Sequence, residues 1–173
     1  MVFGRQRPPL AVRSLLDSST DERLLAWAET DTGGFVAATS FGLWWPEEPA
    51  RLITWHLIDK VVWSEAGFTV IEADLVDDLL LVDREPARVA LERPNKLPEV
   101  VRRRVESSVV RTLEVELSDG VARIVGRKVR GQDGISYWAR LESGTPDSPL
   151  TRLELTEIIE PLRAEAAARL ANL

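Results

Sequence analysis

The stretch ARLITWHLIDKVVWSEAGFTVIEAD (Ala50–Asp74) decides the fold. Its pattern is that of a strand, a tight bend, a second strand, a turn at Ala66-Gly67 and a third strand. Four of the chain's six tryptophans lie within it or close to it, and their large apolar side chains favour a packed core. We therefore expect a small, curved antiparallel sheet at the centre of the protein.

Short apolar segments on both sides extend this sheet. Glycine, proline or paired aspartates separate them, as at Gly33-Gly34 and Asp77-Asp78, and such residues are typical of tight turns. We expect strands at residues 23–30, 34–40, 41–46, 51–55, 60–64, 68–73, 79–83 and 87–92. Short strands at this spacing indicate a barrel or a sandwich rather than a parallel sheet.

The hydrophobic period changes in NKLPEVVRRRVESSVV (Asn95–Val110). The apolar residues that recur every four positions are Leu97, Val101, Val105 and Val109. This spacing predicts an amphipathic helix of about three turns that packs on the sheet. Its polar face carries Arg102–Arg104, which either face solvent or dock an acidic partner.

The chain then returns to strands, which we expect at residues 111–117, 121–130 and 135–142. A terminal amphipathic helix follows, from about residue 151 to residue 171. Pro161 leaves two possibilities open, because a proline inside a helix costs about 3 kcal/mol. Either the helix bends there, or residues 150–155 form a strand and the helix begins near Thr156.

The segment ITWHLIDKVVWSEAGFTVIEA (Ile53–Ala73) contains a strand, a tryptophan, a one-turn bend ending in Ile-Asp, and a return hairpin. It resembles the core of bacterial pleckstrin-homology-like (PH-like) domains, and the resemblance covers about Leu24–Val110. The chain is also similar to uncharacterised actinobacterial proteins of this length that continue into a hairpin and a second helix. The resemblance implies an α+β fold: a PH-like antiparallel roll or barrel capped by a helix, extended by a β-hairpin and a C-terminal helix.

These elements predict three parts within one globular unit. An N-terminal leader (residues 1–22) is either loosely ordered or contains a short helix around Leu10–Leu16. The PH-like, strand-rich core with its capping helix follows at residues 23–110. A hairpin and a C-terminal helix (residues 111–173) then pack on that core.

Composition argues against several classes of protein. The chain of 173 residues has no cysteine, which excludes disulfides, a thiol nucleophile and a zinc–thiolate site. Its longest unbroken aliphatic run, Leu79–Val82, is far shorter than the roughly 20 residues of a membrane-spanning helix. A net charge of −6 disfavours general binding to nucleic acid or anionic lipid. We expect a cytoplasmic protein.

His56 is the only histidine, and hence the one side chain whose ordinary pKa lies near neutrality. No metalloprotease or serine-hydrolase motif surrounds it, so we expect a locally hydrogen-bonded bend residue, with a catalytic or metal-binding role as the alternative. The acidic pairs Glu47-Glu48 and Asp77-Asp78 lie at expected turns and favour solubility rather than acid–base chemistry. We expect no cofactor, no metal and no enzymatic activity.

The best candidate for a functional surface is a basic and aromatic hairpin. Arg123, Arg127 and Lys128 lie on one expected strand, and Trp138 and Arg140 lie on the next. Alternation places Trp138 and Arg140 on one face of their strand, and Arg123 and Arg127 on one face of theirs. If the two faces converge, they form an electropositive patch suited to a carboxylate, a phosphate or an acidic peptide.

A structural role for this hairpin is the alternative. In that case the terminal helix covers Trp138, and the arginines pair with Glu154, Glu157 or Glu160. Trp44 presents the same choice, since Trp44 and Trp45 cannot both face inward on one strand. Trp44 is therefore either an exposed partner contact or is covered by a tertiary element.

From these observations we expect a protein-interaction or structural module without enzymatic activity, whose partner is another protein. The first alternative is a protein that binds a small ligand or an anion, with His56 or the Arg127 and Arg140 pair at its site. The second alternative is a nucleic-acid-associated protein that uses the basic hairpin.

Overall fold

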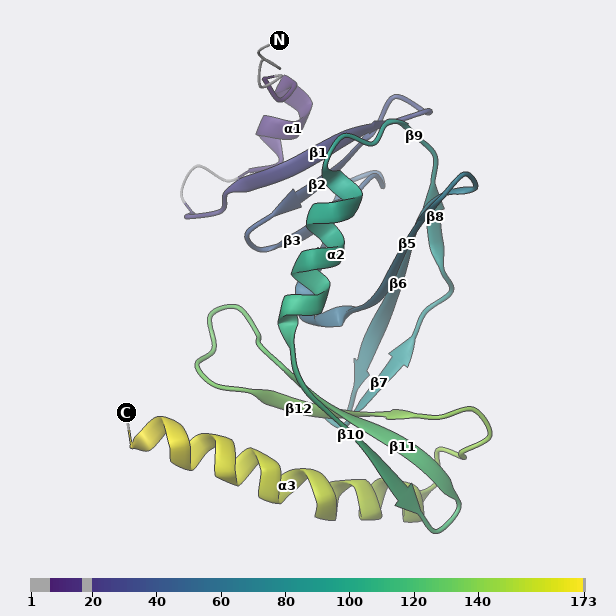
Figure 1. The fold of residues 1–173 in the computed structure, drawn as a ribbon, viewed down its shortest axis with the longest axis vertical. Coiled ribbons are helices and arrows are strands. Elements are labelled where there is room, and N and C mark those ends of the chain that lie inside the picture. Colours follow the sequence, from purple (N-terminus) through teal and green to yellow (C-terminus); the bar gives the residue numbers. More distant parts are fainter. Residues whose placement is uncertain (1–6, 17–19, 173) are drawn as a thin grey trace.

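The computed structural model describes residues 7–16 and 20–172. Within these residues, three α-helices and two sheets of mostly antiparallel strands form an elongated molecule (Figure 1). Helix α2 (Leu97–Ser108) lies in the upper part, and the long helix α3 (Pro149–Ala171) lies beneath the lower strands. The expected α+β class, with antiparallel strands and a helix packed on them, is confirmed.

The first sheet is an antiparallel meander with one added strand. Its strands lie in the order β4-β3-β2-β1-β9. Their bounds are β1 (Leu24–Thr30), β2 (Phe35–Thr39), β3 (Gly42–Trp45), β4 (Arg51–Thr54) and β9 (Leu91–Arg93). The expected turn between the first two strands is present, and Gly33 adopts a φ of 82° that favours glycine.

The second sheet has seven strands in the order β10-β11-β12-β7-β6-β5, with β8 paired to β6. Their bounds are β5 (Ile58–Ser64), β6 (Gly67–Val76), β7 (Leu80–Asp83), β8 (Ala87–Val89), β10 (Val109–Leu117), β11 (Gly120–Arg127) and β12 (Ser136–Leu141). Strand β6 pairs with β5 and β8 along its first half and with β7 along its second. It therefore runs from the upper part of the molecule into the lower part.

The upper part is built around helix α2, as the four-residue spacing predicts. Leu97, Val101 and Val105 are buried, while Arg102 and Arg103 are exposed. The buried face packs among apolar side chains of β1–β6, including Leu43, Ile53 and Phe68. The helix ends at Ser108, so Val109, which the spacing assigned to the helix, instead begins strand β10.

The lower part is a layer of strands on helix α3. The helix begins at Pro149, after Ser148 accepts a hydrogen bond from the backbone N–H of Thr151, and it continues through Pro161. A strand at residues 150–155 is therefore wrong, and the N-terminal cap explains why these residues are helical. The helix buries Leu155 and Ile159 against a core that includes Leu80, Ile124, Tyr137 and Ala139.

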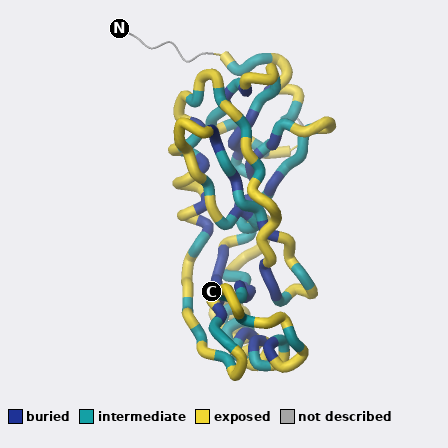
Figure 2. The backbone as a smooth tube through the Cα atoms, turned by 90° about the vertical axis from the view of Figure 1, so that its right-hand side faces the viewer, coloured by how far each residue is buried: buried dark blue, intermediate teal, exposed yellow. Residues whose placement is uncertain are grey.

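The two parts meet through the opposite face of the lower strands. Ala73, Leu81, Val125 and Trp138 form a separate buried cluster there, with Leu57 and Val129 packed against it. Strand β12 runs parallel to β7, with Ala139 opposite Leu80, so the lower sheet includes a strand from the first half of the chain. Figure 2 shows buried stretches in the upper part, in the lower part and where the two meet.

Part of the expected leader is a short helix, α1 (Leu10–Ser14), which agrees with the helix expected around Leu10–Leu16. Val12 on this helix is fully buried. The leader's residues 1–6 and 17–19 lie outside the described residues. No helix in the described part of the chain is both long enough and apolar enough to cross a membrane.

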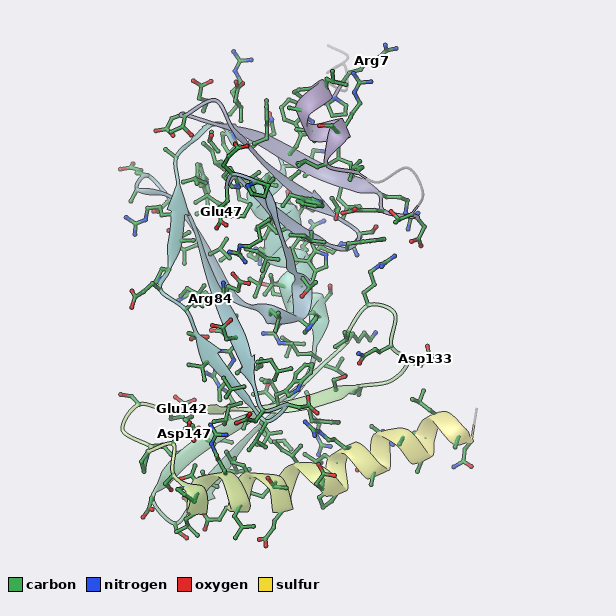
Figure 3. The ribbon with its side chains drawn as sticks, turned by 180° about the vertical axis from the view of Figure 1, so that it is seen from behind. Arg7, Glu47, Arg84, Asp133, Glu142 and Asp147 are labelled. Atoms are coloured by element: carbon green, nitrogen blue, oxygen red, sulfur yellow. The ribbon has the colours of Figure 1, made fainter. Side chains whose placement is uncertain are left out.

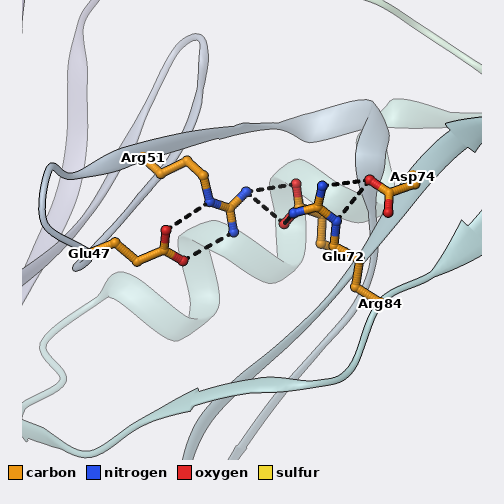
Figure 4. Close-up of polar contacts among 5 residues, drawn as sticks. All are labelled: Glu47, Arg51, Glu72, Asp74 and Arg84. Atoms are coloured by element: carbon orange, nitrogen blue, oxygen red, sulfur yellow. Dashed lines mark hydrogen bonds and ion pairs between the residues drawn. The ribbon is translucent and has the colours of Figure 1, made fainter.

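A chain of ion pairs joins the edge of the first sheet to the second sheet (Figure 4). Arg51 of β4 lies between Glu47 and Glu72 of β6, with its Nη1 2.8 Å from Glu72 Oε2. Arg84 extends the chain to Asp74, and that hydrogen bond lowers the pKa of the Asp74 carboxyl. Each of the three carboxylates in this row of ion pairs, Glu47, Glu72 and Asp74, has an arginine partner. We therefore assign these ion pairs a role in stabilising the fold rather than in binding a ligand.

Candidate functional site

The basic hairpin has the convergence that alternation predicts. In the β11–β12 register, Arg123 lies opposite Arg140 and Val125 lies opposite Trp138, so these side chains share one face. Most of that face is buried, since Arg127, Trp138 and Arg140 have exposed fractions of 1%, 5% and 5%, whereas Arg123 is exposed. The arginines and Trp138 that converge here are therefore mostly shielded from solvent, because the upper part of the molecule covers this side of the sheet.

Arg140 is held by acidic residues of the second sheet. Its guanidinium pairs with Asp83 of β7, and its Nε lies 3.2 Å from Asp59 Oδ1 of β5. The alternative, that the arginines of this face pair with Glu154, Glu157 or Glu160 of α3, is also wrong. Helix α3 packs on the other face of the sheet, beside Tyr137 and Ala139. Arg140 is thus part of the contact between the two halves of the molecule.

Arg127 is a buried cation without a carboxylate partner among the described residues. Its Nη1 donates a hydrogen bond of 2.9 Å to Ser108 Oγ, and its Nε has no partner there. Burial, and secondarily the positive charge of Arg140, lower the pKa of Arg127 to about 10, although the negative charge of Asp59 partly opposes both effects. Burying an uncompensated charge costs several kcal/mol. The surroundings of Arg127 therefore favour a nearby anion.

Trp138 is covered by the expected bend before β5, which in the structure is a 3-10 turn at Trp55–Leu57. The His56 ring stacks on the Trp138 indole, and the indole N–H donates a hydrogen bond of 2.9 Å to Asp78 Oδ1. Burial, and secondarily the positive charge of Arg127, lower the pKa of His56. In the part of the chain that the structure describes, the imidazole makes no hydrogen bond. The expected local hydrogen bond of His56 is thus replaced by stacking.

A basic pocket of about 600 Å³ lies beside this turn, between the C-terminal end of α2 and the β11–β12 loop. Its walls are mostly apolar and include Phe41, Trp55, Val129, Ile135 and Leu170. Its charged residues are Arg104, Lys128, Arg130 and Asp133, and its wall also includes His56 and Ser108. The cations outnumber the single carboxylate, although the chain as a whole is acidic.

The three cations of the basic pocket differ in their partners. Within residues 7–16 and 20–172, neither Arg104 nor Lys128 belongs to an ion pair. Arg130, in contrast, is 2.6 Å from Asp21 Oδ1 through its Nη2, and its guanidinium carbon lies 3.0 Å from the centroid of the Phe41 ring. The pocket therefore offers two free cations and one that already holds a carboxylate.

Arg127 lies directly behind the wall of the basic pocket. Ser108 lines the pocket and accepts the hydrogen bond from Arg127, and His56, another wall residue, is close enough for Arg127 to lower its pKa. Because this cation is shielded from water, its field reaches into the pocket with little screening. The arrangement is thus suited to a ligand that combines an apolar body with a negative charge.

A second, smaller pocket of about 440 Å³ adjoins the first. The two share the residues His56, Val129, Gln132, Asp133, Ile135 and Leu170. The wall of the second also includes Asp78 of the β6–β7 turn and Arg163 of α3, which form an ion pair with each other. Figure 3 shows the loop that carries Asp133 next to the C-terminal end of α3, at the other end of the lower sheet from Glu142. The loop thus borders both hollows.

The remaining predicted site residues have separate surroundings. Lys128 lines the basic pocket. Arg123 does not line it; this exposed side chain forms an ion pair with Glu142, with Arg123 Nε 3.3 Å from Glu142 Oε1. Trp44 is half-buried, and its indole N–H donates a hydrogen bond of 3.0 Å to Glu22, so a tertiary contact covers it in part. The pocket wall also contains residues that no sequence pattern assigned to a site, among them Phe41 and Trp55.

Neither a metal site among the described residues nor a relative of known function points to a different role. In the described part of the chain, no group of three or more acidic or histidine side chains is placed to hold a metal ion. Comparison of the chain with protein-family models, with curated proteins and with solved structures gives no match. The case for a function therefore rests on the pocket alone.

Proposed function

We propose that the protein is a binding module whose basic pocket takes a small organic anion. The observation that carries this proposal is the buried guanidinium of Arg127, which has no carboxylate partner among the described residues. It donates a hydrogen bond to Ser108, which lines the pocket. An anion in the pocket would offset a charge that the fold otherwise buries at a cost of several kcal/mol. This is the anion-binding alternative that the sequence left open.

The size and lining of the basic pocket support a small ligand. A volume of about 600 Å³ lies within the range of small-molecule sites, and Phe41, Trp55 and Leu170 offer apolar contact. Arg104 of α2 and Lys128, which follows β11, offer charge-assisted hydrogen bonds from two different elements. A long nucleic acid fits less well, because Arg127 and Arg140 are buried and cannot track a phosphate backbone.

We also propose that the upper part of the molecule is a PH-like domain. Support comes from the antiparallel meander β1–β4, the following strands β5, β6 and β8, and the helix α2 that packs between them. The lower strands and α3 are then an extension that supplies one wall of the basic pocket through Lys128, Val129 and Ile135. In this arrangement the extension completes the binding site.

Binding of anilinonaphthalene sulfonate tests the proposed function, with the uncharged phenylnaphthylamine as the matched probe. We expect one saturable site for the sulfonate and at least about tenfold weaker binding of the neutral probe. Arg104→Gln and Lys128→Gln should each weaken binding of the sulfonate. Arg102→Gln is the control, because it removes the same charge from the solvent-facing side of α2. Equal binding of the sulfonate by all four proteins would contradict the proposal.

A further inference from the structure

Arg130 marks where the charged group of a ligand would bind. The Phe41 ring contacts one face of its guanidinium, which restricts the orientation of the N–H groups. The Nη2 group then donates a hydrogen bond of 2.6 Å to the Asp21 carboxylate, at the rim of the basic pocket. Asp21 itself is highly exposed, with 88% of its side chain accessible, so solvent competes for this contact.

The Asp21 carboxylate therefore pairs with a guanidinium of fixed orientation, yet it remains exposed to solvent. It comes from the segment before β1, while Arg130 comes from the end of the hairpin, so the contact joins segments that are distant in the chain. An exposed ion pair is worth about 1 kcal/mol or less. A ligand carboxylate that also buries an apolar body in the pocket could replace Asp21 with a net gain.

The charge balance of the basic pocket limits the charge of the ligand. Helix α2 directs its C-terminal end at the pocket, where Ser107 and Ser108 line the wall, and this end carries a partial negative charge. Asp133 adds a full negative charge at the β11–β12 loop. These negative charges offset part of the positive charge of Arg104, Lys128 and Arg130, so a single negative charge on the ligand is enough to pair with Arg130.

We infer, on the basis of the proposed function, that the ligand is an apolar monocarboxylate. Its carboxylate would replace Asp21 as the ion-pair partner of Arg130. The apolar body then lies against Trp55, Val129 and Leu170, within reach of the field of Arg127. Asp21 acts as an internal competitor: it occupies Arg130 in the free protein and sets the concentration of ligand that is required. The same contact favours a carboxylate over a neutral group of the same shape.

Competition against anilinonaphthalene sulfonate on the full chain tests this inference with three probes that share one ring system: naphthoate, naphthyl phosphate and naphthalenemethanol. We expect naphthoate to displace the sulfonate at the lowest concentration and the neutral alcohol at the highest. Asp21→Asn should strengthen naphthoate binding by about threefold to tenfold, because it removes the competing charge. Arg130→Gln should weaken it by about tenfold.

Two controls separate a local effect from a general one. Glu65→Gln removes the same charge at the exposed turn between β5 and β6 and should leave naphthoate binding unchanged. In the double variant Asp21→Asn with Arg130→Gln, removing Asp21 should give no further gain, since its target is absent. Thermal melts of each variant check that the fold is kept.

The outcomes distinguish this inference from the proposed function. If naphthyl phosphate binds more tightly than naphthoate, or if Asp21→Asn behaves as Glu65→Gln does, the monocarboxylate inference is overturned. Binding of the sulfonate that still depends on Arg104 and Lys128 would leave the anion-binding function standing. If the sulfonate does not bind to the wild-type protein, both proposals fall together.

Discussion

The imidazole of His56 stacks on the indole of Trp138, with ring centroids 5.7 Å apart and planes inclined by 24°. His56 belongs to the turn that leads from β4 into β5, whereas Trp138 belongs to strand β12. The contact therefore joins the upper part of the molecule to the lower part. It also places the only histidine near the buried guanidinium of Arg127. Burial, and secondarily the charge of Arg127, lower the pKa of His56.

The lowered pKa of His56 predicts a pH dependence of stability. The unfolded chain has a histidine pKa near 6.5, so as the pH falls the unfolded state takes up a proton before the folded state does. The contribution is fully present above about pH 6.5 and is lost as the pH falls through 6.5 toward the pKa of the folded state. Urea melts between about pH 5.5 and 7.5 should show this loss in the wild-type protein.

His56→Gln is the matched control for that measurement. The variant should lose less stability than the wild type over the same pH interval, because glutamine does not titrate. At neutral pH it should change the free energy of unfolding by no more than about 2 kcal/mol, since only a stacking contact is removed. Identical pH profiles for the two proteins would contradict the lowered pKa of His56.

Val105→Asp should unfold the protein. The side chain is buried on the face of α2 that packs among apolar side chains such as Leu43, Ile53 and Phe68. An unpaired carboxylate there would cost several kcal/mol, a large part of the stability of a domain of this size. Circular dichroism and thermal melts measure the effect. Arg103→Asp, the same charge on the exposed face, should lower stability by about 1 kcal/mol or less.

Local periodicity predicted which residues share a face. The period of two in β12 separated Tyr137 and Ala139 from Trp138 and Arg140, and the period of four in α2 separated Val105 from Arg103. Both separations depend only on backbone geometry within one element. They hold in the structure because neighbouring residues fix them without reference to the rest of the chain.

What covers each face could not be predicted in the same way. Trp138 and Arg140 are covered by Leu57, Asp59 and Asp83, which reach them through the parallel contact of β12 with β7 and through the turn before β5. Such pairings join distant segments, and no repeating pattern in either segment specifies the other.

The basic pocket is only partly visible in the sequence for the same reason. Lys128 and Arg130 follow Arg127 in a basic run, which was a usable signal. Phe41 and Asp21, by contrast, lie in other segments and reach the pocket only through the tertiary fold.

Pro161→Ala should stabilise the protein. Pro161 lies inside α3 and is exposed, and because proline has no N–H, the carbonyl of Glu157 lacks its intrahelical donor. Restoring that donor should raise the free energy of unfolding by about 1–3 kcal/mol, less what the proline gains by restricting the unfolded chain. Urea melts measure the difference. Pro149→Ala is the control and should have little effect, because the first turn of a helix does not use this N–H.

Replacing both buried arginines, Arg127 and Arg140, with glutamate should unfold the protein rather than only abolish binding to a partner. Arg140→Glu would place a third carboxylate beside Asp59 and Asp83, and Arg127→Glu would put a buried negative charge next to Ser108. Breaking a buried ion pair costs about 3–5 kcal/mol, so the double variant should show no cooperative thermal transition. Arg123→Glu is the control, since Arg123 lies opposite Arg140 in the register yet is exposed, and it should cost about 1 kcal/mol or less. A double variant that melts like the wild type would mean that this face of the hairpin is not buried between the two parts of the molecule.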